Sequence, residues 1–297
     1  VITAKMCSSC FAIPSVTIQL FVTSAALLYG QRVLVQKRAQ STSKWTKRVA
    51  FGITVLVSIA LSGFGAFLFV LATNDDYRRR GFADFLSAQS AKPKALDEYR
   101  CSILERGNVS GRVLEFGPGP GANFKCFQNT TSARSIERYV AVEPNEYFKE
   151  EMRKEKDAQG LDDFPLEIVG LRGEDIDIAP EDHGSFDVVV LTHVLCSVDS
   201  VQSVLANAEK ALKPDGGRIV FMEHVLAPEG TTTWYVQRFM APALYILANG
   251  CTFKDLVTEM GSYLGNRFDI DFSHFEAPMP WFMHFVRPHI KGVATKR

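Results

Sequence analysis

Three glycines at alternate positions behind an acid form the segment of this chain best suited to bind a nucleotide. Glu115 lies near the end of an apolar run, and the glycines that follow it are Gly117, Gly119 and Gly121. A residue without a Cβ lets the backbone turn sharply and approach a ligand closely. The spacing predicts a strand, a tight turn and the start of a helix. A glycine turn that binds nothing is the alternative.

A second acid, Glu143, follows the next apolar run. An acid at the carboxyl end of the second strand can hold the two ribose hydroxyls of a nucleoside cofactor. Gly117, Gly119 and Ala122 also satisfy the G-x-G-x-x-A pattern, which keeps a nicotinamide or flavin dinucleotide as an alternative. Glu115, however, would repel a pyrophosphate and tolerate a cationic sulfonium. The motif therefore favours S-adenosyl-L-methionine over a dinucleotide.

Further polar side chains follow three other predicted strands. Asp175 lies in a Gly-Glu-Asp turn after the third, where it can accept a hydrogen bond from an adenine amino group or face solvent. The fourth strand ends at Thr192 and His193, and the fifth ends beside His224. Ligands of open α/β sheets bind at these carboxyl ends, so we expect Thr192 to contact the cofactor and at least one histidine to act in catalysis. Cys196 is interpreted as a small buried residue in preference to an acceptor-site thiol.

Short apolar strands alternate with helical segments from about residue 84 onward. The expected strands and helices are 112–116, 139–142, 166–169, 186–191 and 218–222, with edge strands at 268–272 and 282–286 and helices at 95–105 and 201–212. This alternation predicts an α/β fold with a doubly wound, mostly parallel, Rossmann-like sheet. The apolar stretch 234–248 either roofs the site or packs in the core, and Pro242 within it predicts a kink or break.

Two long apolar runs precede this region. Residues 49–73 are uncharged over 25 positions and predict a transmembrane helix. Residues 11–30, uncharged over 20 positions, predict either a second such helix or the hydrophobic region of a signal peptide. The expected division is a membrane-anchoring region, 1–83, and a catalytic domain, 84–297. Basic residues lie between the runs and again at 78–80, so the positive-inside rule gives conflicting orientations.

Charge and cysteine content argue against other classes of protein. The 33 basic and 33 acidic residues cancel, so no nucleic acid is expected as a partner. The six cysteines are scattered, which favours a reducing compartment for the globular part. Cys7 and Cys10 form a C-x-x-C without a second ligand pair, and no metal site is expected. The sequons at Asn108 and Asn129 test the topology, because a glycan on either would contradict a cytosolic domain.

Several longer motifs resemble a known family. Five features resemble class I S-adenosylmethionine-dependent methyltransferases. They are the E-x-G-x-G-x-G segment, Glu143, Gly-Glu-Asp, Phe-Asp-Val-Val-Val and Leu-Lys-Pro-Asp-Gly-Gly. More specific segments resemble the methyltransferase-like protein 7 family of membrane-bound thiol S-methyltransferases, at 121–124, 194–198, 222–225, 249–251 and 286–290. The resemblance covers roughly residues 84–293. The family's loop usually reads Gly-Cys-Gly-Thr-Gly where this chain has Gly-Pro-Gly-Pro-Gly, and members usually carry one N-terminal hydrophobic segment where this chain has two.

The resemblance implies methyl transfer to small thiols, including alkyl thiols and hydrogen sulfide, at endoplasmic reticulum or lipid-droplet membranes. Because S-adenosylmethionine is made in the cytosol, we expect the catalytic domain to lie on the cytosolic side. We expect Glu143 to bind the ribose, Asp175 the adenine, and Glu115 with the glycines the methionine end. His224 is the first candidate for a base acting on the thiol, and His193 is the second. Two alternatives are methylation of an oxygen, nitrogen or carbon acceptor such as a lipid or quinone, and a catalytically silent membrane scaffold.

Overall fold

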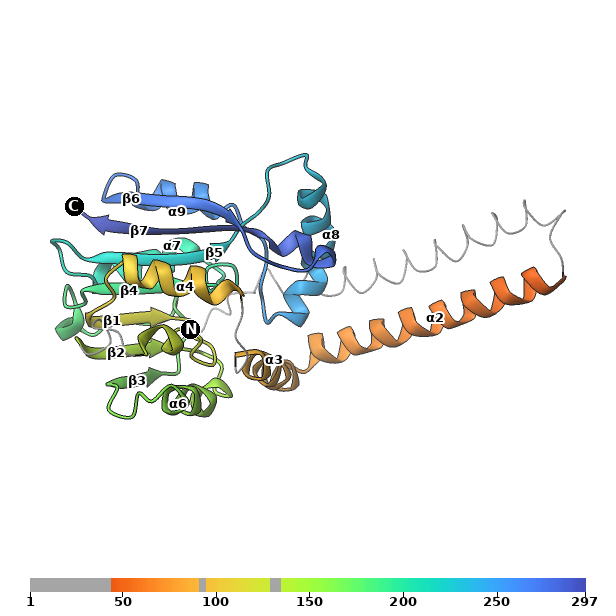
Figure 1. The fold of residues 1–297 in the computed structure, drawn as a ribbon, viewed down its shortest axis with the longest axis horizontal. Helices are drawn as coiled ribbons and strands as arrows, with labels where there is room; N and C mark the ends of the chain where they lie inside the picture. Colours follow the sequence, from red (N-terminus) through yellow and green to blue (C-terminus); the bar gives the residue numbers. More distant parts are fainter. Residues whose placement is uncertain (1–43, 91–94, 129–134) are drawn as a thin grey trace, which may run out of the picture. The chain divides into compact units, whose positions relative to one another are not determined.

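The computed structural model describes residues 44–90, 95–128 and 135–297 (Figure 1). The chain forms two compact units, Val1–Arg78 and Arg79–Arg297, which are treated separately below. Helix α3 (Asp75–Ser90) crosses the boundary between them. Its first turn is capped by Asn74, whose side-chain oxygen accepts a hydrogen bond from the backbone N–H of Tyr77 at 2.9 Å.

The described part of the first unit is dominated by one long helix, α2 (Lys44–Thr73). Its 30 residues correspond to about 45 Å at 1.5 Å per residue, more than the hydrocarbon thickness of a bilayer. Large apolar side chains along it are exposed, among them Phe51 and Ile53. In the described ranges α2 is the helix that is long and apolar enough to cross a membrane, which agrees with the predicted segment 49–73. The predicted segment 11–30 lies outside the described residues.

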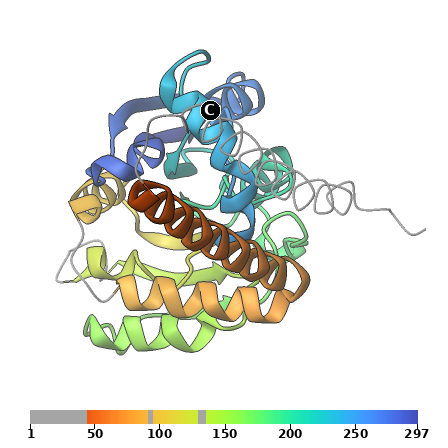
Figure 2. The same cartoon turned by 90° about the vertical axis from the view of Figure 1, so that its right-hand side faces the viewer.

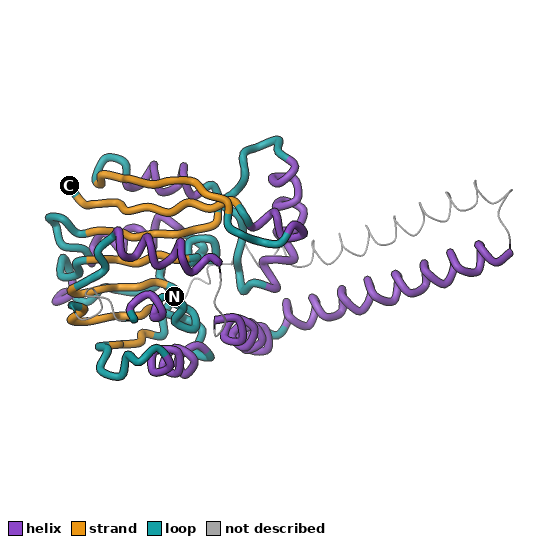
Figure 3. Tube along the Cα trace, in the orientation of Figure 1, coloured by secondary structure: helices purple, strands orange, loops and turns teal. Residues whose placement is uncertain are grey.

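The second unit is built on a seven-stranded sheet in the order β3-β2-β1-β4-β5-β7-β6 (Figures 1 and 3). The first five of these strands are parallel, whereas β7 runs antiparallel to both β5 and β6. The strand bounds are Gly111–Phe116 (β1), Ile136–Val142 (β2), Leu166–Val169 (β3), Val188–Thr192 (β4), Arg218–His224 (β5), Phe268–Glu276 (β6) and Pro288–Lys296 (β7). The doubly wound, Rossmann-like α/β fold predicted from the alternation of elements is therefore confirmed.

Helices cover both faces of the sheet because successive strand residues point to opposite sides. In β4, Val188 and Val190 belong to a core under α4 (Ala95–Arg106) and α6 (Phe148–Ala158). Val189 and Leu191 belong to a core under α7 (Val201–Ala211) and α9 (Leu256–Leu264). A strand buried on both faces reads as a continuous apolar run, which is the pattern that predicted β4.

The second half of α3 packs beside the start of α6, and the two helices run side by side in Figures 1 and 2. Phe82 meets Phe148 edge to face with ring centroids 6.1 Å apart. The Arg79 carbonyl accepts a hydrogen bond from the Asn145 side chain at 2.9 Å, and the Arg79 guanidinium donates to the carbonyl of Pro144. These contacts tie α3 to the loop that follows β2.

One local prediction was wrong, and of the kink or break predicted at Pro242 the break is absent. Residues 282–286 lie in a 3-10 helix, η4 (Trp281–Val286), and the edge strand begins at Pro288. The consecutive aromatic run lacks the alternating burial of a paired strand, and Met283 instead donates its backbone N–H to the Pro280 carbonyl at 2.9 Å. Helix α8 (Thr232–Leu247) continues through Pro242.

Two cysteines of the globular unit are joined in a disulfide bond. Cys101 of α4 and Cys126 of η2 (Phe124–Phe127) form a disulfide. The expectation of scattered reduced cysteines is therefore wrong for this pair, because 25 residues of chain return the second cysteine to the first. The disulfide joins α4 to the segment that follows the glycine loop.

The antiparallel edge of the sheet supplies a test of packing. At Gly292 of β7 an added Cβ would lie 2.5 Å from the Phe272 Cβ and 2.6 Å from the Asp271 carbonyl oxygen. We expect Gly292→Ala to destabilise the domain by about 1–3 kcal/mol, because neither neighbour is the end of a flexible side chain. Thermal unfolding of the full chain measures the effect.

Gly261→Ala is the matched control, since a Cβ there meets nothing within 4 Å and the position lies inside α9. Alanine in a helix interior is favoured over glycine by about 1 kcal/mol, so the melting temperature should hold or rise. Equal effects of the two substitutions would contradict the packing described for β7.

Candidate active site

The glycine loop is closely packed at Gly117 and has space for a side chain at Gly119. Gly117 adopts φ +63°, and a Cβ there would lie 2.4 Å from the Val194 Cγ2. Its N–H donates to the Val142 carbonyl at 2.9 Å, which holds the loop against β2. Gly119 adopts φ +58°, and a Cβ there would meet nothing within 4 Å. Gly119 is itself buried, but space is left beside it where a side chain would lie. Ligand binding at the glycine loop stays a prediction.

Glu143 holds this loop from the end of β2. One carboxylate oxygen accepts the Gly119 N–H at 3.0 Å, and the other accepts the Asn145 N–H at 2.8 Å. Burial raises the pKa of Glu143 to about 7, against the lowering effect of these two hydrogen bonds. A carboxylate has about four lone-pair sites, so Glu143 can accept two further donors such as a pair of ribose hydroxyls.

Glu115 is fully enclosed in a polar network. Its oxygens accept from the Asn123 side chain at 2.5 Å and from the Tyr139 hydroxyl. The same Asn123 amide donates to the Thr192 hydroxyl at 3.1 Å, and its oxygen accepts from the Arg100 guanidinium at 3.0 Å. Burial raises the pKa of Glu115 to about 7, although these hydrogen bonds and the Arg100 charge oppose the shift.

Two histidines continue the chain of hydrogen bonds from Arg100. The guanidinium lies 3.4 Å from Nδ1 of His193, and Nε2 of His193 lies 3.1 Å from Nε2 of His289. Arginine only donates, so His193 accepts at Nδ1 and carries its proton on Nε2. His289 then accepts at Nε2 and donates from Nδ1 to the Arg287 carbonyl at 2.8 Å. Burial lowers the pKa of His289 to about 4, in agreement with a neutral ring.

His224 points to a pair of cysteines. Its Nε2 lies 3.1 Å from the Cys251 sulfur, which lies 3.4 Å from the Cys196 sulfur. The hydrogen bond from Cys251 lowers the pKa of Cys196 well below its usual range. Burial opposes a charge on His224, but the neighbouring Cys196 sulfur outweighs it and raises the pKa of that imidazole. The His224 and His193 rings lie 6.1 Å apart, so the two predicted histidines do come together at the sheet edge.

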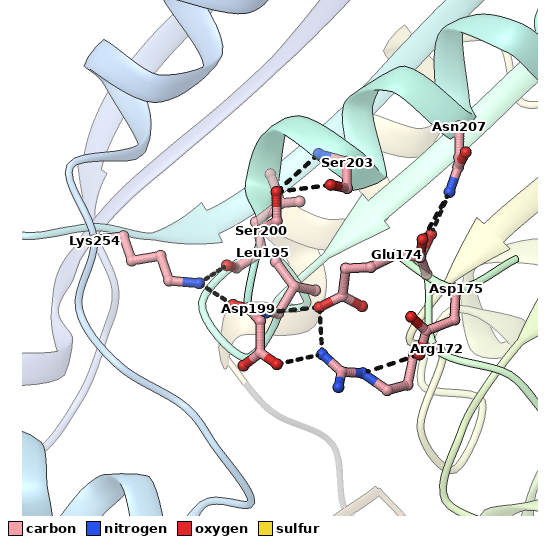
Figure 4. Close-up of polar contacts among 11 residues, drawn as sticks. Arg172, Glu174, Asp175, Leu195, Asp199, Ser200, Ser203, Asn207 and Lys254 are labelled. Carbon is pink, nitrogen blue, oxygen red and sulfur yellow. Dashed lines mark hydrogen bonds and ion pairs between the residues drawn. The ribbon is translucent and has the colours of Figure 1, made fainter. Parts of the chain in front are cut away.

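The turn that carries Asp175 is held by ion pairs with Arg172, which also contacts Glu174 and Asp199 (Figure 4). The Asp175 side chain is 61% exposed and pairs with Nε of Arg172 at 3.6 Å. Glu174 is more enclosed, with 9% exposure, and its carboxylate accepts from Arg172 at 2.8 Å and from the Asp199 N–H at 2.6 Å. The assignment of Asp175 to the adenine stays a prediction.

A groove of about 880 Å³ opens at the same edge of the sheet. Its walls come from the loop after β5, the start of α8, the end of β6 and the start of β7; the residues include Val225, Pro228, Trp234, Phe275, Pro288 and His289. Because His289 also contacts His193, the groove leads toward the histidines. The arrangement can therefore hold a nucleoside beside the glycine loop and admit a second molecule from the groove.

Sequence reasoning missed several of these residues. Arg100 lies on a helix before β1, where no motif marks it, and Asn123 follows the last loop glycine. His289 lies in a predicted family segment, but its place depends on antiparallel pairing with His224. Cys251 follows Asn249 and Gly250 in a positive-φ turn, a signal of a special backbone that could have drawn attention to it.

The burial of Glu115 predicts a pH dependence of stability. A carboxyl whose folded pKa is about 7, above its unfolded value of 4.5, stabilises the fold fully below pH 4.5 and loses that contribution as pH rises through 7. Glu115→Gln keeps an acceptor for Asn123 and replaces the oxygen that accepts from Tyr139 with an N–H that can donate to the Tyr139 hydroxyl. We expect the variant to be more stable than wild type at pH 8, by up to about 3 kcal/mol, with a shallower fall between pH 5 and 8.

Denaturant unfolding at several pH values measures this difference. The fall should be shallower and not abolished, because burial also raises the pKa of Glu143 to about 7 and that of Glu223 to about 8. Parallel curves for wild type and variant would contradict the ionisation described for Glu115.

Comparisons with known proteins agree with this geometry. The family described as "Methyltransferase domain" matches residues 77–261. The human thiol S-methyltransferase TMT1A is 33% identical over 199 residues, covering 66% of this chain and 75% of its own length. The human thiol S-methyltransferase TMT1B is 33% identical over 195 residues, covering 63% of this chain and 72% of its own length.

The fold is also that of solved methyltransferases. The geranyl diphosphate C-methyltransferase of Streptomyces coelicolor, crystallised with S-adenosyl-L-homocysteine, superposes with a TM-score of 0.51 at 13% identity over 68% of this chain and 79% of that one. With a matching family domain over more than half of its length, the chain belongs to the S-adenosylmethionine-dependent methyltransferases, in the family that includes TMT1A and TMT1B.

Proposed function

We propose that this methyltransferase is anchored in a membrane and transfers the methyl group of S-adenosylmethionine to small lipophilic thiols, including alkyl thiols, and to hydrogen sulfide. The observation that carries the acceptor class is the 33% identity with two enzymes named thiol S-methyltransferases. The sulfur and imidazole groups at the carboxyl edge of β4 and β5 agree with chemistry on a soft nucleophile.

The cofactor would lie along the glycine loop. Glu143 would accept the ribose hydroxyls, and the space left where Gly119 lacks a side chain would allow close approach. Both oxygens of Glu115 are already engaged, so its role at the methionine end is to orient Asn123 and to supply negative potential that tolerates the sulfonium. Asp175 would accept from the adenine amino group.

The reaction would be an in-line displacement at the sulfonium methyl, so the protein mainly has to align two atoms. A thiolate is the reactive form, and a free thiol with pKa near 8.5 is mostly protonated at neutral pH. We assign to His224 the promotion of the thiolate form. His193 and His289 act as positioning residues, because both ring nitrogens of each are engaged in the neutral state.

Membrane attachment would deliver lipophilic acceptors to the groove. Helix α2 supplies a span of sufficient length. The catalytic unit also exposes aromatic side chains on α8 and η4, with Phe239 and Trp281 each about 80% exposed. Such side chains favour the membrane–water interface. We propose an endoplasmic reticulum or lipid-droplet location with the catalytic unit on the cytosolic side, where the cofactor is made.

The first test is transfer of labelled methyl from S-adenosylmethionine to an alkyl thiol by membranes that carry the full chain. Glu143→Ala should raise the dissociation constant of the cofactor by about 10- to 100-fold, because it removes a charged acceptor worth roughly 1.5–3 kcal/mol. The exposed Glu146→Ala is the matched control and should bind normally.

The outcomes separate the levels of the proposal. Methylated thiol from wild type and Glu146→Ala, but not from Glu143→Ala, would support both cofactor site and acceptor. Cofactor binding without transfer to any thiol would refute the acceptor class and direct attention to oxygen, nitrogen and carbon nucleophiles. An absence of cofactor binding would refute the site.

A second prediction concerns His224. His224→Gln should lower kcat about 10²- to 10⁴-fold for an alkyl thiol of high pKa at pH 7, because removal of a group that promotes ionisation costs that much. The cofactor dissociation constant should be unchanged. The loss should shrink for thiols of lower pKa, which ionise without help; an equal loss for every thiol would argue for a structural role alone.

A further inference from the structure

Cys196, His224 and Cys251 form a group that the sequence did not indicate as a metal site. Their ligand atoms, two sulfurs and one imidazole nitrogen, all lie within 4.8 Å of one another. The side chains come from the turn after β4, the end of β5 and the turn after α8. Separate segments that converge on one point with soft donor atoms are the usual construction of a transition-metal site.

The distances are close to those of tetrahedral zinc. Zn–S bonds of 2.3 Å and Zn–N bonds near 2.05 Å place two sulfur ligands about 3.8 Å apart and a sulfur and a nitrogen about 3.6 Å apart. The observed separations are 3.4 Å between the two sulfurs and 3.1 Å between the Cys251 sulfur and Nε2 of His224. An expansion of a few tenths of an ångström would admit the ion.

The backbone around the two cysteines is held in place by hydrogen bonds that do not use the sulfurs. The Cys196 carbonyl accepts from the Thr252 N–H at 3.0 Å and from its hydroxyl at 3.2 Å, so the two cysteine-bearing turns are joined directly. The Lys254 ammonium donates to the Leu195 carbonyl at 2.9 Å and to the Val198 carbonyl (Figure 4). Fixed ligands reduce the entropic cost of binding a metal.

Glu223 fixes the position of His224 relative to Cys196. One of its oxygens accepts the N–H groups of Val194 and Leu195 at 2.9 and 3.2 Å, which ties the end of β5 to the turn that carries Cys196. His224 follows Glu223 directly in the chain. The buried Glu223 side chain thus fixes the end of β5 against the turn after β4. Residues behind the ligands hold them in place in the same way in known metal sites.

We propose that Cys196, His224 and Cys251 bind one zinc ion and leave its fourth position for the acceptor thiol. Three protein ligands with one open position are typical of catalytic zinc, and a Cys₂His set is one such combination. Zinc binding is inferred from the geometry alone, whereas the identity of the fourth ligand rests on the proposed thiol methyltransferase function.

The charges favour the reaction. Zinc with two thiolates and a neutral imidazole carries no net charge, so an added acceptor thiolate makes the site singly negative beside the cationic sulfonium. The thiol proton goes to water. The new bond joins the acceptor sulfur to the methyl carbon, while the old S–C bond breaks and leaves its electron pair on S-adenosylhomocysteine. The neutral thioether is a weaker ligand than a thiolate and leaves the metal.

Metal analysis of the full chain, purified in detergent without chelator, tests the site. We expect about one zinc ion per chain, falling to a tenth or less in Cys196→Ser, Cys251→Ser and His224→Gln. Two double variants control for other thiols, Cys7→Ser with Cys10→Ser and Cys101→Ser with Cys126→Ser, and both should keep the zinc. Retained S-adenosylmethionine binding reports that each variant is folded.

Wild type with no more metal than the three ligand variants would overturn the proposal, as would a Cys196–Cys251 disulfide found by peptide mapping in freshly purified wild type. Loss of zinc in the Cys7 and Cys10 double variant would assign the metal to those cysteines and would also overturn the proposal.

Cobalt substitution tests the fourth position. Tetrahedral cobalt with thiolate ligands has near-ultraviolet charge-transfer and visible bands, and we expect an alkyl thiol to change both without the cofactor. Bound metal with an unresponsive spectrum and no thiol methylation would overturn the thiol function and the fourth ligand while leaving the zinc assignment. Full thiol methylation by metal-free chain would support the thiol function and overturn this inference.

Discussion

The buried charge pair of Glu115 and Arg100, bridged by Asn123, is the interaction on which the site depends. Isolated buried charges are costly, and hydrogen bonds that cross from β1 to α4 and the loop engage both Glu115 oxygens and both terminal nitrogens of Arg100. The same guanidinium orients His193, so that the cofactor side and the acceptor side share one support. The Cys101–Cys126 disulfide joins α4, which carries Arg100, to η2, which directly follows Asn123.

The parallel arrangement of β1, β2, β4 and β5 explains why so many polar groups meet. Carboxyl ends of parallel strands lie on one edge, where the glycine loop, Glu143 and His224 converge. The antiparallel β7 enters from the opposite direction and brings His289 to the same edge, in register with His224. One strand of reversed direction thereby completes a histidine cluster that parallel strands alone would lack.

The site holds three carboxyls whose pKa values burial raises to 7 or 8, at Glu115, Glu143 and Glu223. A fold optimised for stability alone would avoid them, since their ionisation in a buried place is unfavourable. Each one instead fixes a backbone or side chain at the sheet edge. This is the usual balance between stability and a preorganised site.

Local sequence patterns were enough to predict the strands β1 to β5, the glycine turn, the acid at Glu143 and the apolar helix at 49–73. These follow from periodicity, missing Cβ atoms and the length of an apolar run, which act over a few residues. The folded chain was needed to show that Arg100 and His289 reach the site, and that Cys251 lies beside His224 and Cys196. Those contacts depend on strand direction and on the return of distant segments, which no local pattern encodes.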